Sequence, residues 1–235
     1  MKIKTLLLGL AMIFTVGAAG VQAQKKDVTK FMGIPVDGTK TAMIQKLKAK
    51  GFTYNAKLDR LEGEFNGRDS YIMFVTNKDK VWRIAVVNKN PMSASEAKDR
   101  FNTLCWQFEN NRKYLPMKYV LLPNLKIYIG PDDFQINTNE DLSYEMTVNK
   151  KKYKASYYQL SDIVINKSET LWTKKNNYEI TLKEYQDSLC GLIQTYYDDN
   201  NNKRFVWLDI QEQFGEYYIL IFYDNENNES NGEDL

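Results

Sequence analysis

The chain has 235 residues, and its 32 lysines and arginines nearly balance 30 aspartates and glutamates. It contains no histidine, which excludes catalysis by Ser-His-Asp, Cys-His or HExxH groups and removes the commonest transition-metal ligand. The charges are mixed along the chain and form no basic cluster, so we expect no nucleic-acid partner. No metal-ligand or cofactor motif is found, and we expect no metal or cofactor.

Residues 1–23 have the pattern of a cleavable export signal. Lys2 and Lys4 precede an apolar stretch over 5–20, and Val21-Gln22-Ala23 offers small residues before the cleavage point. Two glycines interrupt the apolar stretch, which falls short of the roughly 20 residues that span a bilayer, so cleavage is favoured over anchoring. We therefore expect an exported product, periplasmic or secreted, with no stable membrane span after cleavage.

The mature chain opens with a helix followed by three strands. The helix is predicted over Thr39–Lys50, where apolar residues recur on one face. Strands are predicted at Leu58–Phe65 and Arg68–Val75, joined by Asn66-Gly67, a pair that accepts the positive φ angles of a type I′ turn. A third strand at Val81–Val87 completes an antiparallel meander.

A second helix begins at a capping box formed by Ser93 and Glu96 and continues to about Asn110. Its apolar residues repeat at helical spacing, and we expect this face to cover the meander. They are Ala97, Phe101, Leu104, Cys105 and Phe108. The first half of the mature chain is therefore predicted as α-β-β-β-α.

The second half begins with residues that favour strands. These segments are Tyr114–Ile129, Ser143–Val148 and Tyr153–Gln159. Two further short strands are predicted at Asp162–Ile165 and Thr170–Trp172. These predicted strands indicate a second antiparallel sheet in the second half of the chain.

The second half ends with a helix and a hairpin. A capping box of Thr181 and Glu184 begins the helix, which continues through Tyr197. The hairpin is predicted from strands at Phe205–Ile210 and Glu216–Tyr223. This order of elements resembles that of the first half.

The predicted fold class is α+β, with antiparallel sheets covered by helices. The two long helices align when Ser93 is placed on Thr181, which leaves open two similar α-β-β-β-α subdomains or one two-part domain. The tail lacks apolar residues before its last position and is expected to be disordered. The predicted parts are a signal at 1–23, an N-terminal α+β unit at 24–117, a C-terminal α+β unit at 118–223 and an acidic tail at 224–235.

The two cysteines, Cys105 and Cys190, both lie on predicted helices in the exported part. An oxidising compartment permits a disulfide between them, provided that the two helices pack side by side. The alternative is two small buried residues in separate cores, because a reduced cysteine packs like a small hydrophobic residue.

The second half is rich in aromatic residues. Tyr153, Tyr157, Tyr158 and Trp172 are the candidate ligand-binding residues, because tyrosine and tryptophan supply large contact areas with few rotatable bonds and a polar tip. The alternative is core packing. On a strand Tyr157 and Tyr158 point to opposite faces, so we expect at least one to lie away from the core.

Five segments carry a resemblance to other proteins: Phe31–Thr39, Lys50-Gly51-Phe52, Leu61–Gly67, Val206–Ile210 and Ile219–Asn225. They resemble a family of exported proteins of unknown function from Gram-negative anaerobic bacteria. The resemblance implies export but no activity. The unit of helix and antiparallel sheet is also similar to the fold of β-lactamase-inhibitory proteins and of the small lipoprotein subunit of the outer-membrane assembly machine. Such a likeness of fold does not imply function.

By elimination, the sequence predicts an exported non-catalytic protein that binds a protein or glycan partner in the envelope or outside the cell. Two alternatives stay open: a histidine-free hydrolase of cell-wall or glycan substrates that uses two carboxylates, and an envelope-assembly factor. Convergent carboxylates with raised pKa values in a deep pocket would favour the hydrolase. A broad exposed aromatic patch would favour binding.

Overall fold

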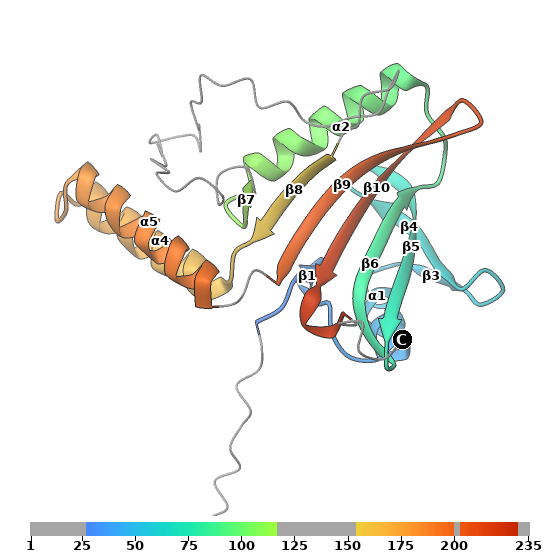
Figure 1. Cartoon of the computed structure of the whole chain (residues 1–235), viewed down its shortest axis with the longest axis horizontal. Coiled ribbons are helices and arrows are strands. Elements are labelled where there is room, and N and C mark those ends of the chain that lie inside the picture. The colour runs from blue at the N-terminus through green and yellow to red at the C-terminus, as the bar shows by residue number, and fades with distance from the viewer. Residues whose placement is uncertain (1–26, 117–153, 200–202, 230–235) are drawn as a thin grey trace, which may run out of the picture.

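The computed structural model describes residues 27–116, 154–199 and 203–229, which form one large antiparallel sheet with helices around it (Figure 1). The eight strands lie in the order β3 (Thr53–Asn55), β4 (Arg60–Phe65), β5 (Arg68–Asn77), β6 (Lys80–Asn88), β10 (Glu216–Asn225), β9 (Arg204–Gln213), β8 (Lys154–Gln159) and β7 (Tyr114–Pro116). A separate small sheet pairs β1 (Lys30–Phe31) with β2 (Ile34–Pro35). The predicted α+β class is confirmed. Because β10 pairs with β6, the two halves of the chain share one sheet.

The first helix, α1 (Lys40–Lys48), is confirmed together with its cap. The Thr39 side chain accepts a hydrogen bond from the backbone N–H of Ala42, and Met43, Ile44 and Leu47 are buried. The helix lies against β3 and β6 on one face of the sheet. Its buried stripe therefore covers the meander end of the sheet.

The predicted hairpin of β4 and β5 is also confirmed. Asn66 and Gly67 have φ angles of 50° and 72°, as a type I′ turn requires. β6 follows through a second tight turn, so β4, β5 and β6 form the predicted meander.

The second helix, α2 (Ala94–Glu109), begins at the predicted capping box. The Glu96 backbone N–H donates to the Ser93 hydroxyl at 3.3 Å, and the Ser93 backbone N–H donates to the Glu96 carboxylate at 2.8 Å. The predicted apolar face is buried, but its main strand partners are β7, β9 and β10. The expectation that α2 covers the meander is confirmed in part. The buried face of α2 shares one cluster with Leu61, Ile72 and Ile84, but β10 inserts beside β6 and brings second-half strands under the helix as well.

Residues 162–176 form a helix, α4 (Asp162–Asn176), so the two short strands predicted there are wrong. The Ser161 side chain accepts a hydrogen bond from the backbone N–H of Val164 and caps the helix. Asp162 in the first turn and two lysines in the last turn suit the helix dipole. These end signals outweigh the strand preference of the β-branched residues inside the segment.

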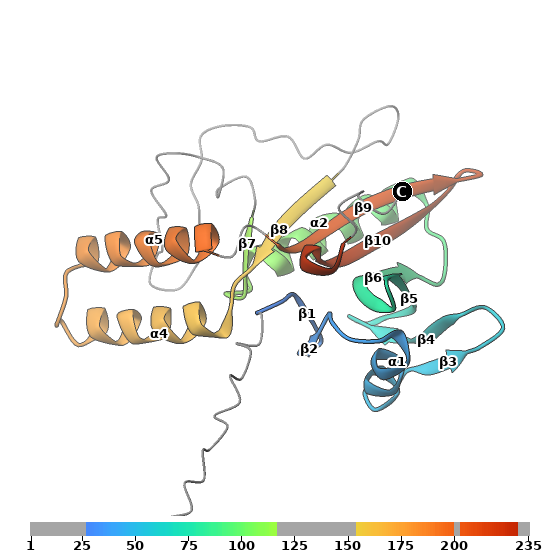
Figure 2. The ribbon, with the colours of Figure 1, turned by 60° about the horizontal axis from the view of Figure 1, so that its bottom comes forward.

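The next helix, α5 (Leu182–Asp199), starts at the predicted capping box, where the Glu184 backbone N–H donates to the Thr181 hydroxyl at 3.2 Å. Figure 2 shows α4 and α5 lying side by side as a hairpin that projects beyond the β7–β8 end of the sheet. The two helices that align in sequence, α2 and α5, thus lie in different environments.

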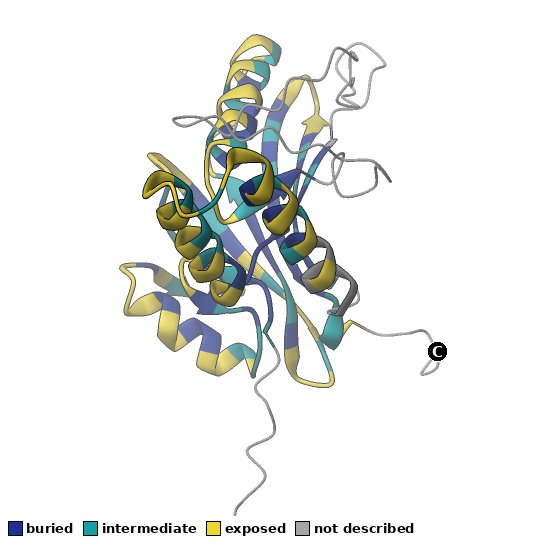
Figure 3. Ribbon diagram, turned by 90° about the vertical axis from the view of Figure 1, so that its left-hand side faces the viewer, coloured by how far each residue is buried: buried dark blue, intermediate teal, exposed yellow. Residues whose placement is uncertain are grey.

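Two hydrophobic clusters hold these layers together. The larger cluster lies between the sheet and the two helices α1 and α2. The smaller cluster joins the α4–α5 hairpin to Leu115, Tyr158 and Phe205 at the β7–β9 end of the sheet. Figure 3, in which the hairpin faces the viewer, shows exposed residues along its outer sides. Tyr158 and Phe205 point away from the larger cluster, so the hairpin covers the opposite face of the sheet.

The predicted closing hairpin is confirmed as β9 and β10, but it extends beyond the predicted end at Tyr223. Asp224 and Asn225 are buried at the end of β10, and a short 3-10 helix, η1 (Glu226–Asn228), follows. The predicted start of the disordered tail at residue 224 is therefore wrong, because residues 224–228 belong to β10 and η1. Asn225 donates a hydrogen bond to the backbone carbonyl of Val36 at 2.8 Å, a long-range contact that composition does not indicate.

Some predictions fall outside the described residues. They are the export signal at 1–23, the strand-rich residues 117–129 and 143–148, and Tyr153. Among the helices that the structure describes, none has the length and apolar character needed to cross a membrane.

Replacing Gly63 with alanine should destabilise the fold by about 1–3 kcal/mol. A Cβ atom built at Gly63 would lie 2.7 Å from the ring of the buried Phe52. The matched control is Gly191→Ala on α5, where a Cβ atom meets nothing within 4 Å. Because alanine favours helices, that change should stabilise by up to about 1 kcal/mol. Urea unfolding measures the change in the free energy of unfolding for each variant. Equal changes in Gly63→Ala and Gly191→Ala would contradict the close packing of Gly63 against Phe52.

Candidate binding surface on the sheet

The aromatic residues singled out from the sequence do not form one exposed surface. Tyr157 and Tyr158 have exposed fractions of 1% and 0%, so the expectation that one of them lies away from the core is wrong. The reason is that α2 covers one face of β8 while the α4–α5 hairpin covers the other. Trp172 on α4 is half-buried and packs edge-on against Tyr185, with ring centroids 5.8 Å apart.

Cys105 and Cys190, both within the described residues, are not joined by a disulfide. Cys105 is buried in the larger cluster under α2, whereas Cys190 lies at the smaller cluster on α5. The helices that carry them lie on opposite faces of the sheet, so the predicted bridge is not formed. The alternative of two residues in separate cores is the arrangement observed.

A different surface is left uncovered on the face opposite α1 and α2. We call it the open face and define it by three rows across neighbouring strands. The rows are Tyr71, Val87, Leu220 and Asp209; Met73, Ala85, Phe222 and Trp207; and Val75, Arg83 and Asp224. Within residues 27–116, 154–199 and 203–229, no helix packs on these rows, because the α4–α5 hairpin reaches only the β7–β9 end.

The open face is apolar and accessible on β5. Met73 and Val75 have exposed fractions of 38% and 41%. Leu220, Phe222 and Trp207 beside them on β10 and β9 are half-buried. Apolar side chains therefore continue across four strands without a break.

An ion pair surrounded by aromatic rings lies within this apolar area. The Arg83 guanidinium donates two hydrogen bonds to the Asp224 carboxylate, at 2.7 and 2.6 Å, and the Trp207 indole N–H donates a third at 2.8 Å. The guanidinium carbon lies 4.3 Å from the Trp82 ring centroid and 5.1 Å from that of Phe222. Such contacts fix the side chains in one arrangement before any partner binds.

The rings beside this pair are also ordered against each other. Trp207 and Phe222 stack with centroids 4.0 Å apart and an angle of 19° between their planes. Sequence reasoning did not single out these residues, although the apolar run over 217–223 carried a signal. Apolar residues at both odd and even positions of β10 indicate a strand that carries apolar side chains on both faces of the sheet.

Charged residues border the open face near β4. The guanidinium carbon of Arg60 lies 3.5 Å from the centroid of the Tyr71 ring, and Lys89 approaches the same ring at 5.8 Å. Both cations also pair with Glu62, and the hydrogen bond from Arg60 holds the pKa of that carboxyl below its usual range. A shallow cleft of about 640 Å³ between Thr53, Glu62 and Lys89 adjoins this edge.

Two acidic side chains, Glu62 and Asp69, line the cleft beside β4, and the pKa of the Glu62 carboxyl is lowered there. Burial raises the pKa of the Glu226 carboxyl, and repulsion from Glu229 and Asp224 adds to this shift. Glu226 lines neither the cleft beside β4 nor a second one between α2 and β4, and Asp224 already accepts three hydrogen bonds. The same ranges contain no group of three acidic or cysteine side chains placed to hold a metal ion.

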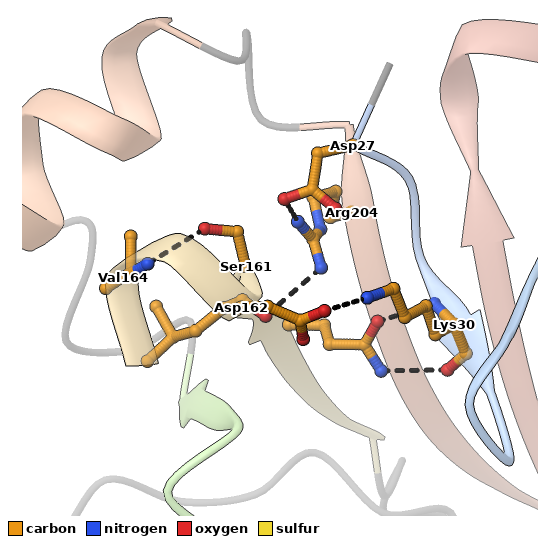
Figure 4. A network of polar contacts seen from close by, with 8 residues as sticks. Asp27, Lys30, Ser161, Asp162, Val164 and Arg204 are labelled. Atoms are coloured by element: carbon orange, nitrogen blue, oxygen red, sulfur yellow. Dashed lines mark hydrogen bonds and ion pairs between the residues drawn. The ribbon is translucent and has the colours of Figure 1, made fainter. Parts of the chain in front are cut away.

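Figure 4 shows the polar junction between the N-terminal segment, the start of β9 and the start of α4. Arg204 at the start of β9 is buried, and its guanidinium forms an ion pair with Asp27. The same guanidinium donates to the backbone carbonyl of Leu160 at 3.1 Å, immediately before the Ser161 cap of α4. The N-terminal segment is thereby tied to the base of the hairpin.

A second, exposed ion pair at this junction joins Lys30 to Asp162. The hydrogen bond from Lys30 lowers the pKa of the Asp162 carboxyl below its usual value. The stability contributed by this pair is therefore present at neutral pH and is lost as the pH falls through the lowered pKa. An NMR titration should place the Asp162 midpoint below that of an ordinary aspartate, and Lys30→Gln should raise it. An unchanged midpoint in Lys30→Gln would show that the pair does not form in solution.

Comparisons with models of known protein families, with curated proteins and with solved structures find no match to this chain. The resemblance noted from the sequence therefore stays a prediction.

Proposed function

We propose that the protein is an exported, non-catalytic binding module that recognises a folded protein partner through the open face. The observation that carries this proposal is the accessible apolar surface over β5, β6, β10 and β9, with Met73 and Val75 exposed at 38% and 41%. Contiguous apolar patches of this kind on a protein surface mark interaction sites. The pattern of residues 1–23 supports a partner in the envelope or outside the cell.

The composition of the open face fits a protein partner better than a glycan. Its centre combines tryptophan, phenylalanine and arginine, which dominate the energetics of protein interfaces, and charged residues form its rim. Recognition of sugar hydroxyls needs accessible acceptors. The central carboxylate of Asp224 is 4% exposed and already accepts bonds from Arg83 and Trp207. The carboxylate at the centre is therefore occupied, and the apolar surface around it favours contact with a similar surface of a protein.

The test is affinity capture by the immobilised mature chain from envelope and culture fractions of the cells that produce it. The test variant is the double substitution Met73→Glu and Val75→Glu, which places two charges on exposed positions of the open face. The matched control is Leu58→Glu with Trp106→Glu, two apolar residues exposed at 57% and 65% and lying elsewhere on the molecule. Circular dichroism melting verifies that each variant is folded.

We expect the immobilised native chain and the control to retain one partner protein. The open-face variant should not retain it. Burial of two unpaired charges in an interface should weaken binding at least about 100-fold. Equal retention by the open-face variant, or equal loss from the control, would contradict the proposal. Retention of a polysaccharide in place of a protein would also contradict it.

A further inference from the structure

A groove on the other side of the sheet offers a site that is independent of the open face. It has a volume of about 380 Å³ and lies between α2, β4, β7, β10 and the β1–β2 turn. One wall is formed by Met32 and Phe65, the other by Gln107 and Phe108, and Tyr223 lies between them. The volume falls within the range of small-molecule sites.

Aromatic contacts hold both walls of this groove in place. Phe31 packs against Phe65 and Tyr223, with centroid distances of 5.3 and 4.8 Å. Across the groove, Phe108 packs edge-on against Tyr114 at 4.7 Å. The Tyr114 hydroxyl accepts a hydrogen bond from the Gln159 side chain at 3.1 Å, which fixes its ring. The rings are therefore positioned before a ligand enters.

The uncharged polar groups that line the groove are side-chain amides and the hydroxyls of Tyr114 and Tyr223. At one end of the groove the Asn66 side-chain amide donates a hydrogen bond to the side-chain oxygen of Gln107 at 2.7 Å. The Arg100 guanidinium donates to the backbone carbonyl of Asn66 at 2.9 Å. Glu64 also contributes to the lining, but it alternates with Phe65 on β4, so its side chain points to the opposite face of the sheet. The groove described here thus presents aromatic surface and amides. A charged ligand would lose its hydration without gaining a counter-charge.

Met32 occupies an unfavourable backbone conformation at the edge of the groove. It has a φ of 50° in the two-residue turn Met32-Gly33, where glycine or asparagine is preferred. The chain places Asn66 at the same position of the β4–β5 turn, with a φ of 50°. Because the Met32 side chain also lines the groove, this conformation motivates a test of its role in binding. A thioether makes favourable contacts with the edges of aromatic rings.

From these features we infer that the groove binds a small uncharged ligand with a flat aromatic body, which lies between Phe65 and Phe108 and contacts the Met32 thioether. Amide groups of Gln107 and its neighbours hydrogen-bond to the ligand edge. This inference does not depend on the proposed protein partner.

The test uses N-phenyl-1-naphthylamine, an uncharged aromatic dye whose fluorescence rises in apolar sites. The native chain should bind one equivalent of the dye saturably. Met32→Asn relieves the backbone strain and removes the thioether, so it should raise the melting temperature by about 2–4 °C and weaken dye binding about three- to tenfold. A purely structural role for Met32 predicts the rise in melting temperature without the loss of binding.

The matched control is Phe214→Asn at the tip of the β9–β10 hairpin. Phe214 has the same kind of conformation, with a φ of 55°, and is 97% exposed. The control should gain stability and keep the native dye affinity. The open-face variant with glutamates at 73 and 75 should also keep it, which separates this site from the proposed protein interface. Absence of saturable binding, or unchanged affinity in Met32→Asn, would overturn the inference.

Discussion

Replacing Asp27 with asparagine should lower the free energy of unfolding by about 3 kcal/mol. The reason is the position of its partner, because Arg204 has a side chain that is 1% exposed and therefore cannot recover hydration when the carboxylate is lost. Among the hydrogen bonds described above, the one to the Leu160 carbonyl remains, and it is too little to compensate a buried guanidinium. Urea denaturation followed by circular dichroism measures the change.

The control for this prediction is Asp162→Asn at the same junction. The side chains of Lys30 and Asp162 are 28% and 69% exposed, so solvent screens their ion pair. Removing that pair should cost less than about 1 kcal/mol. If both substitutions had the same effect, the buried pair of Asp27 and Arg204 would not form as described. If Asp27→Asn were neutral, the hairpin would have to be held by other contacts.

Arg83→Met should destabilise the protein by about 2–4 kcal/mol. The methionine leaves Asp224, whose side chain is 5% exposed, with only the Trp207 indole as a hydrogen-bond donor among the contacts described above. The double variant Arg83→Met with Asp224→Leu should regain most of the lost stability, because it removes both charges together.

A double-mutant cycle on these two positions measures the coupling directly. We expect a coupling free energy above about 1 kcal/mol, since the two side chains make two hydrogen bonds to each other at 2.7 and 2.6 Å. Additive single effects would show that the ion pair does not order the open face. Additivity would also remove the physical basis for a preorganised interface.

Local signals in the sequence were enough to predict much of the fold. The Asn66-Gly67 turn fixed the register of β4 and β5, and the two capping boxes placed the starts of α2 and α5. Each of these signals acts between residues only a few positions apart. The start of α4 was missed because Ile163, Val164 and Ile165 favour strands when read alone, whereas the Ser161 cap and tertiary packing select a helix.

The candidate surface could not be predicted in the same way. Alternation on β8 correctly places Tyr157 and Tyr158 on opposite faces, but burial depends on which helices reach those faces. The open face exists because β10 pairs with β6 across more than 120 residues of sequence and because the α4–α5 hairpin stops at the β7–β9 end. Such pairings leave no local pattern. Arg83 and Asp224 are therefore brought together by topology alone.

Site-specific photocrosslinking tests directly whether the open face contacts a protein. A benzophenone amino acid introduced in place of Val75 lies on the open face, and the same amino acid in place of Lys46 lies on α1, on the opposite face. After irradiation in producing cells, we expect one discrete protein adduct from position 75 that is absent from position 46. No adduct at 75, or the same adduct at both positions, would contradict the proposal.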